Sequence, residues 1–232
     1  MRVLGLIPAR GGSIGIPSKN IKLLNGLPLI AYSIMQAKQA ERIDRVIVST
    51  DDDEIKSVAE NYGAEVPFLR PAELATSSAS SLDVILHALN WLQEHDELYD
   101  VVCLLQPTSP YRPNGIIDLA IEEFQVSGVD SLVSLRKVPD HYNPFWTFIK
   151  DESGHFKTTI SGNLIPRRQE LPLAYHRDGA IYLLSVNQML KEGTLLGERI
   201  GGVEIPSPEL INIDTYQDWL LAEKHMKDVA DC

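Results

Sequence analysis

The chain has 232 residues, which is enough for one large domain with a small appended part. Hydrophobic residues make up 44% and charged residues 23%, as in a soluble globular protein, and the formal net charge is -11. Because so acidic a chain repels a phosphate backbone, we expect no nucleic-acid partner, and an anionic small molecule would need locally concentrated positive charge.

The cysteines and the hydropathy pattern indicate which cellular compartment and which kinds of metal or membrane site to expect. Cys103 lies in an apolar run and Cys232 is the last residue, and neither has a metal-ligating neighbour at useful spacing, so we expect no zinc site and no disulfide framework. The apolar run at 3–7 is too short for a signal peptide, and no stretch reaches the roughly 20 apolar residues that span a bilayer. These features predict a cytoplasmic protein with no membrane partner.

Short apolar strands alternate with helical patterns through the first 135 residues. The predicted strands and helices are, in chain order, strand 3–7, helix 28–40, strand 45–49, helix 52–62, strand 66–69, helix 80–93, strand 101–105, helix 114–125 and strand 131–135. This alternation predicts an α/β fold with a doubly wound, mostly parallel sheet. Ligands of such folds bind beyond the carboxyl ends of the strands, so the loops after Ile7, Ser49 and Leu105 are expected to line one cleft.

The pattern changes at about Pro139. Residues 139–178 are rich in proline, asparagine, histidine and aromatic residues without helical periodicity, which indicates an irregular, β-rich excursion. Strands at 180–184 and 203–205 and a helix at 216–227 follow. We therefore expect one α/β domain formed by 1–138 and 179–232, and a separate arm at 139–178.

Three glycines directly follow the first strand, in Pro8-Ala-Arg-Gly-Gly-Ser-Ile-Gly-Ile-Pro-Ser-Lys-Asn20. Glycine lets the backbone turn tightly and aim N–H groups at an anion, and Arg10 and Lys19 flank the loop, which favours a triphosphate cradle. The spacing matches neither a P-loop nor a dinucleotide fingerprint. The alternative is an ordinary flexible turn with solvated charges.

Two further loops carry unusual polar residues. In the segment from Gln106 to Arg112, two prolines restrict the backbone and pre-organise polar side chains for hydrogen bonding, although a rigid structural loop is the alternative. Between Arg70 and Ser81 lies a serine-rich stretch. Capping of the following helix accounts for Ser80 or Ser81, but not for Arg70.

The segment Asn212-Ile213-Asp214 places two polar side chains on one face of an extended chain. Such a pair suits Mg²⁺ or Mn²⁺, with substrate phosphates completing the ligand shell. The alternative is that Asp214 only caps the C-terminal helix.

The ordered motifs PARGGSxGIPSKN, STDD, RPAELA, LLQPTSPYR, RRQELP, DGAIYL and NIDT resemble the acylneuraminate cytidylyltransferase family, the CMP-sialic acid synthetases and their legionaminic and pseudaminic acid relatives. The resemblance extends from Ile7 to Asp218. It implies a nucleotidyltransferase that couples an acidic nine-carbon (nonulosonic) sugar to CMP from CTP, releases pyrophosphate, requires Mg²⁺ or Mn²⁺ and serves cell-surface polysaccharide biosynthesis.

The resemblance also implies roles for individual residues. The CTP phosphates would contact Arg10, Ser13 and Lys19, with Gly11 and Gly12, and the nucleoside would contact Asn20, Arg70 and Ser80. The sugar would contact Gln106, Arg168, Tyr175 and Asp178, with Arg167 near them. The metal ligands would be Asp214 and Asn212. Residues 139–178 would be a dimerisation arm that reaches the partner's cleft, so the resemblance implies a homodimer.

Two positions depart from the family's pattern. Ile14 stands where the glycine loop usually has lysine, and Asn212 stands where the metal site usually has a first aspartate. Both changes remove charge from the proposed centre, which leaves open a different nucleotide or sugar, or a catalytically weak sugar-nucleotide-binding homologue. The aromatic segment 140–146 leaves the acyl sugar open, and His141 and His176 are the candidates for a general base.

Overall fold

The computed structural model describes residues 1–160, 162, 164–205 and 212–230. By internal contacts the chain divides into one unit of Met1–Ser134 with Asp178–Cys232 and a second of Leu135–Arg177. The larger unit holds every element that borders the candidate site described below.

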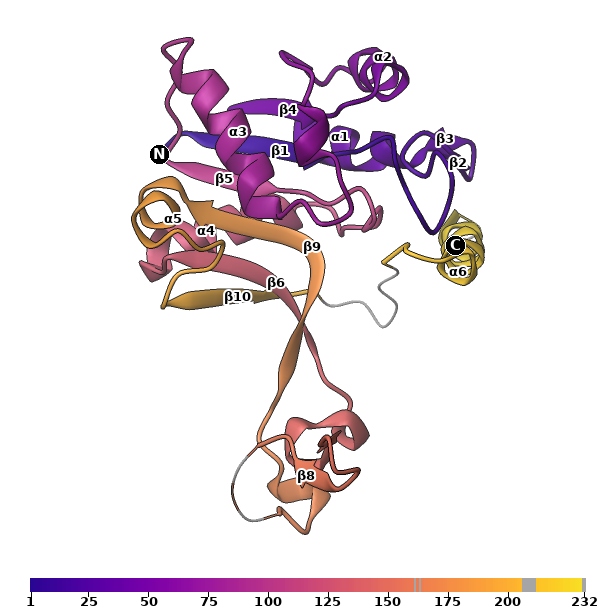
Figure 1. The fold of residues 1–232 in the computed structure, drawn as a ribbon, viewed down its shortest axis with the longest axis vertical. Coiled ribbons are helices and arrows are strands. Elements are labelled where there is room, and N and C mark those ends of the chain that lie inside the picture. The colour runs from indigo at the N-terminus through magenta and orange to yellow at the C-terminus, as the bar shows by residue number, and fades with distance from the viewer. Residues whose placement is uncertain (161, 163, 206–211, 231–232) are drawn as a thin grey trace. The chain divides into compact units, whose positions relative to one another are not determined.

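A six-stranded sheet forms the centre of the larger unit, with the strand order β10-β6-β9-β5-β1-β4 (Figure 1). Its strands are β1 (Val3–Pro8), β4 (Arg45–Ser49), β5 (Val101–Leu104), β6 (Ser131–Lys137), β9 (Tyr175–Ser185) and β10 (Ile200–Glu204). Strand β1 pairs in parallel with both β4 and β5, whereas β9 runs antiparallel to β5. The predicted α/β class and mostly parallel core are confirmed, with an antiparallel strand inserted beside β5.

Helices cover the sheet on both faces. The α-helices of the described residues are α1 (Leu29–Gln39), α2 (Asp53–Asn61), α3 (Ser81–Gln93), α4 (Ile116–Ser127), α5 (Val186–Glu192) and α6 (Tyr216–Ala230), of which α6 packs beside the sheet rather than on it (Figure 1). Val3 and Ile7 share a buried cluster with side chains of α1, α2 and α4. Leu4 and Leu6, on the opposite face of β1, are also fully buried. Burial on both faces explains why β1 reads as a continuous apolar run.

A small hairpin, β2 (Leu23–Leu24) and β3 (Leu27–Pro28), was absent from the sequence prediction. Asn25 and Gly26 both have positive φ, at 49° and 86°, as a tight hairpin turn of the Asn-Gly type requires. Helix α6 contacts this hairpin (Figure 1). A second buried cluster joins them, formed by Ile16, Leu24, Leu29, Ile213, Trp219 and Ala222.

The strand predicted at 66–69 does not form. Only isolated bridges join this segment to β4 and its end, between Ile47 and Glu65 and between Thr50 and Leu69. Pro67 has no N–H to donate to a ladder, which explains the interruption. Helix α5 was also missed, since its seven residues between the cap Ser185 and the left-handed Gly193 are too few to show a helical period.

The second unit contains little regular structure. An antiparallel pair, β7 (Phe148–Lys150) and β8 (Phe156–Thr158), is surrounded by 3-10 turns at Asp140–Tyr142, Pro144–Trp146 and Arg168–Glu170. Another such turn in the chain, Ala72–Leu74, belongs to the larger unit. All three residues of β7 are exposed. The irregular character predicted for this stretch is therefore what the structure shows, with β7 and β8 as one short hairpin within it.

Candidate active site

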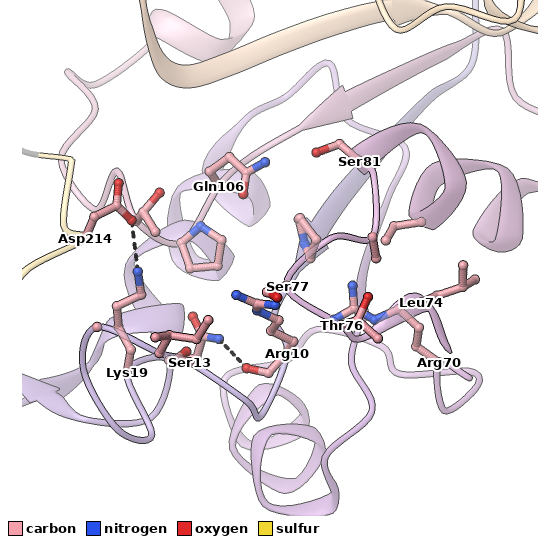
Figure 2. Close-up of a pocket in the computed structure, with 18 residues that line it drawn as sticks. Arg10, Ser13, Lys19, Arg70, Leu74, Thr76, Ser77, Ser81, Gln106 and Asp214 are labelled. Carbon is pink, nitrogen blue, oxygen red and sulfur yellow. Dashed lines mark hydrogen bonds and ion pairs between the residues drawn. The ribbon is translucent and has the colours of Figure 1, made fainter. Parts of the chain in front are cut away.

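One cavity of about 340 Å³ lies within the larger unit (Figure 2). It is bordered by the loop after β1, the segment between residues 70 and 84, the loop after β5, and Asp214. The prediction that the loops after Ile7 and Leu105 line one cleft is confirmed. The loop after Ser49 does not line it, although Asp51 in that loop contacts two residues of the site.

Two of the three glycines after β1, Gly11 and Gly15, are required by close contacts rather than by backbone conformation. Neither Gly11 nor Gly15 has a left-handed φ, but a Cβ on Gly11 would lie 2.5 Å from the Asp52 carboxylate. A Cβ on Gly15 would lie closer than 3.0 Å to the main-chain oxygen of Asp214. Glycine therefore lets this loop touch two other segments of the chain.

The N–H groups of this loop are partly used within the protein. Gly11 N–H donates to Asp51 Oδ1 over 3.1 Å, and Ser13 N–H donates to the Gly11 oxygen over 2.9 Å. Within the described part of the chain, the N–H groups of Gly12, Ile14 and Gly15 donate no hydrogen bond. Those three are the amides that the loop can offer to an anion.

Lys19 joins the loop to the C-terminal segment. Its ammonium donates to the Ile213 oxygen at 2.8 Å and to Asp214 Oδ1 at 3.2 Å (Figure 2). The Lys19 side chain is only 13% exposed, whereas that of Asp214 is 64% exposed. The structure thus brings the predicted phosphate cation and the predicted metal ligand into direct contact.

Arg10 and Asn20 lie together in the same loop. The buried Asn20 donates from Nδ2 to the Arg10 oxygen over 2.9 Å, which fixes the backbone from which the Arg10 side chain extends to the cavity (Figure 2). Among the described residues, the Arg10 guanidinium has no ion-pair partner. It is therefore free to meet an anionic ligand.

Arg70 is the most deeply buried cation on the cavity wall, with a side chain that is 4% exposed. Its nearest carboxylate is Asp51, 3.8 Å away, and its Nε and Nη2 atoms have no hydrogen-bond partner. Burial lowers the pKa of Arg70, an effect that Asp51 opposes and the neighbouring Arg10 reinforces. Unpaired donors on a buried guanidinium are costly unless a ligand accepts from them.

Residues of the serine-rich stretch have two different places in the structure, the N-terminus of α3 and the wall of the cavity. Ser80 is the N-cap of α3 and accepts from Asp83 N–H at 3.1 Å, so the capping interpretation accounts for this residue. Ser80 does not border the cavity, whereas the adjacent Ser81 does. The serines of this stretch that a ligand in the cavity can meet are therefore Ser77 and Ser81, not Ser80.

Gln106 lines the cavity, and the fully buried Arg112 fixes its backbone. Arg112 donates from Nη2 to the Gln106 oxygen at 2.9 Å, from Nε to the Ala180 oxygen at 2.9 Å, and from Nη1 to Ser33 and Gln36 of α1. Burial lowers the pKa of Arg112 to about 10. Sequence reasoning gave this arginine no role, although it stands in the same motif as Gln106.

Asp214 does not cap α6. Thr215 and Asp218 cap it reciprocally: Asp218 Oδ2 accepts from Thr215 N–H at 2.7 Å, and Thr215 Oγ1 accepts from Asp218 N–H at 3.3 Å. The capping alternative for Asp214 is therefore wrong. Instead, Asp214 Oδ2 accepts from Asn212 Nδ2 at 3.0 Å, so the predicted pair does lie together.

The donor set at Asp214 fits Mg²⁺ or Mn²⁺ in the manner of phosphate-dependent sites. An exposed carboxylate borders a cavity with cationic walls, and Mg²⁺ commonly uses one or two carboxylates with substrate phosphates and water. Among the described residues, no three His, Cys, Asp or Glu side chains converge on a point. A metal here would thus depend on a bound phosphate.

The remaining predicted sugar residues divide between the two units. Asp178 is buried in the larger unit, where it accepts from the Ser134 hydroxyl and from Ala180 N–H at 3.0 Å. Arg168 and Tyr175 belong to the second unit, where Arg168 forms an ion pair with Asp140 and Tyr175 is exposed. Asp178 does not border the cavity of the larger unit.

In the part of the chain that the structure describes, no helix combines the length and the apolar character needed to cross a membrane.

Known proteins similar to this chain have a consistent chemistry. A family model described as cytidylyltransferase matches residues 4–148. The CMP-N,N'-diacetyllegionaminic acid synthase of Legionella pneumophila is 38% identical over 98% of this chain and 97% of its own length. The pseudaminic acid cytidylyltransferase of Campylobacter jejuni serotype O:2 is 35% identical over 94% of this chain and 93% of its own.

Solved structures share the fold at low identity. A CMP:2-keto-3-deoxy-manno-octonic acid synthetase complexed with CTP aligns with a TM-score of 0.70 at 17% identity, over 98% of this chain and 99% of its own. A 4-diphosphocytidyl-2C-methyl-D-erythritol synthase from Anaerococcus prevotii aligns with a TM-score of 0.67 at 15% identity, over 97% and 98%. With the match of the family model and the full-length relatives, these findings show that the chain belongs to the cytidylyltransferase family.

Proposed function

We propose that this protein transfers CMP from CTP to a nonulosonic acid and releases pyrophosphate. The observation that carries the proposal is the cavity that gathers Arg10, Lys19, Arg70, Gln106 and Asp214. It offers cations for a triphosphate and a carboxylate for a divalent metal, on a chain whose net charge is -11. The relatives that span the whole chain are named for the same reaction class.

In the proposed reaction the anomeric hydroxyl of the sugar attacks the α-phosphorus of CTP. An oxygen–phosphorus bond to the sugar forms, the bond between the α-phosphorus and the bridging oxygen breaks, pyrophosphate leaves, and the hydroxyl proton is released. Such transfers depend mainly on positioning and on charge stabilisation. Arg10 and the free amides of the glycine loop would hold the phosphates, and Arg70 with Ser81 would hold the nucleoside.

Asp214, with Asn212 hydrogen-bonded to it, would hold Mg²⁺ or Mn²⁺. When bound, the ion would neutralise phosphate charge beside the attacking hydroxyl. Lys19 already contacts Asp214, so this ammonium and the metal would share one carboxylate. Lys19 would therefore lie where the departing pyrophosphate accumulates charge.

The sugar would be gripped from the second unit of another subunit, in a homodimer. Support comes from the apolar side chains that this unit leaves exposed, among them Tyr142, Phe148, Ile149 and Phe156. An isolated two-stranded hairpin is marginally stable in water, so a partner surface would stabilise it. Arg168 would supply a guanidinium for the sugar carboxylate. We place the enzyme in the cytoplasm, where CTP is available.

A pyrophosphate-release assay with CTP, Mg²⁺ and a panel of nonulosonic acids tests the proposal. We expect turnover with at least one acid and none with GTP. Ile14, which is 78% exposed on the cavity wall in place of the expected lysine, favours a second candidate: a homologue that binds a sugar nucleotide without turning it over. Binding of CTP without pyrophosphate release from any acid would select that candidate.

A further inference from the structure

Asp51 contacts Arg70, which borders the cavity, and Gly11, which belongs to the loop after β1 that forms part of the cavity wall. Its Oδ1 atom accepts from Gly11 N–H at 3.1 Å and lies 3.8 Å from Arg70 Nη2. The Asp51 side chain is 26% exposed and does not border the cavity. One carboxylate oxygen therefore joins the glycine loop after β1 to the buried guanidinium on the opposite segment.

The local fold explains why Asp51 reaches both partners. Thr50 follows β4 directly, and its oxygen accepts from Arg70 N–H at 2.7 Å, which places the Arg70 backbone beside Asp51. The adjacent Asp52 acts elsewhere, because its Oδ1 caps α2 by accepting from Glu54 and Ile55 N–H. Asp52 therefore caps α2, whereas Asp51 contacts Gly11 and Arg70.

Asp51 supplies the negative charge that offsets Arg70, which has a second arginine as its neighbour. Arg70 is buried beside Arg10, and the mutual repulsion of the two cations disfavours both at close range. Within the described residues, Asp51 is the carboxylate paired with Arg70. Without it, a buried guanidinium with unpaired Nε and Nη2 atoms would have no counter-charge to hold it in place.

We infer that Asp51 is the positioning residue that aligns Arg70 with the glycine loop, so that the nucleoside and phosphate ends of CTP meet walls held at a fixed separation. The inference rests on the proposed function, because it takes CTP as the ligand. Asp51 itself touches no substrate; it acts through Gly11 and Arg70.

Simple electrostatics predicts the opposite of this inference, which makes it testable. Removing an acidic group beside an anion site tightens anion binding, and Asp53→Asn, a loss of the same charge two residues away, measures that effect alone. Asp53 is exposed in the first turn of α2. We expect Asp51→Ala to weaken CTP binding about tenfold, the equivalent of one charge-assisted contact, and Asp53→Asn to stay within about twofold of wild type.

The experiment is calorimetric titration of CTP into the full-length protein, with wild type, Asp51→Ala, Asp51→Asn and Asp53→Asn, and again in an Arg70→Ala background. If Asp51 acts through Arg70, Asp51→Ala adds less than about twofold once Arg70 is gone. A merely structural role would give the same loss in both backgrounds. In steady-state assays we expect the Asp51 variants to change KM for CTP more than kcat.

The outcomes separate cleanly. Asp51→Ala binding CTP as tightly as Asp53→Asn overturns the inference, as does a tenfold loss that persists without Arg70. Should Asp51→Ala fail to fold, Asp51→Asn decides: it keeps an oxygen for Gly11 N–H but no charge, and affinity equal to that of Asp53→Asn refutes the role. Wild-type protein that binds no CTP refutes the proposed function itself, and the inference with it.

Discussion

Replacing Gly15 by alanine should separate the glycine loop from the C-terminal segment. The new Cβ would lie within 3.0 Å of the Asp214 main-chain oxygen, whereas a relaxed carbon–oxygen contact is about 3.3–3.6 Å. Backbone must therefore retreat by several tenths of an ångström at the least. The same movement would pull on the hydrogen bond from Lys19 to the Ile213 oxygen and on the bond from Ile213 N–H to the Thr108 oxygen.

Overpacking of this kind costs about 1–3 kcal/mol of unfolding free energy. At roughly 2–4 °C per kcal/mol for a chain of this size, Tm should fall by about 2–12 °C. Gly12→Ala is the matched control, because a Cβ there meets nothing within 4 Å and neither glycine has a left-handed φ. Thermal and urea unfolding of the two variants tests the argument. Equal stability of Gly15→Ala and Gly12→Ala would show that the contact with Asp214 does not constrain the loop.

Four other outcomes follow from the site. Ile14→Lys should tighten CTP binding about tenfold by adding one charge-assisted contact, and calorimetry that shows no gain would mean that position 14 does not face the phosphates. Asp214→Asn should lose most turnover and most of the response to Mg²⁺ while its unfolding curve stays unchanged; full turnover would remove Asp214 from the metal site. Mixing Arg168→Ala with Lys19→Ala should restore activity to about half the wild-type level per mixed dimer if sites are shared between subunits, whereas a verified mixed dimer without activity argues against sharing. Although burial alone would raise the pKa of Asp218, hydrogen bonds from Thr215 and Asp214 outweigh it and lower the pKa below 3.8, so its stabilisation should be complete above pH 3.8 and lost as pH falls through the lowered value. Asp218→Asn should therefore flatten the acid limb of a Tm-against-pH profile, and an unchanged limb would contradict this.

The parallel core was predictable because its strands carry strong local signals. Runs such as Arg45–Ser49 are apolar and β-branched, and the helices between them show clear periods with caps at Asp52 and Ser80. The hairpin of β2 and β3 had a signal that went unused, the pair Asn25-Gly26. By contrast, the antiparallel direction of β9 depends on long-range pairing with β5, which no local pattern encodes.

The site was predictable where a residue stands in a motif that the chain shares with the family it resembles. Arg10, Lys19, Arg70, Gln106 and Asp214 were expected in one cleft, and all five border the cavity. What motifs could not reveal was the use of each group within the protein. Contacts between residues distant in sequence decide how each group is used. For example, the main-chain oxygen of Asp214 lies so close to residue 15 that only glycine fits there.

Buried contacts between the two ends of the sequence have a further consequence. Ile16, on the underside of the glycine loop, packs in a cluster with Leu24, Leu29, Ile213 and Trp219.

Since about 200 residues separate Ile16 from Ile213, a ribosome adding roughly 5–20 residues per second needs about 10–40 s to make the second after the first. During that interval the strands of the sheet can pair, but Ile16 in the loop after β1 remains exposed to solvent because its partners Ile213 and Trp219 have not been made. The proposed nucleotide site should therefore be among the last parts of a newly made chain to become competent, and we expect a nascent chain stalled before Trp219 to lack the proposed triphosphate site even where its sheet has formed.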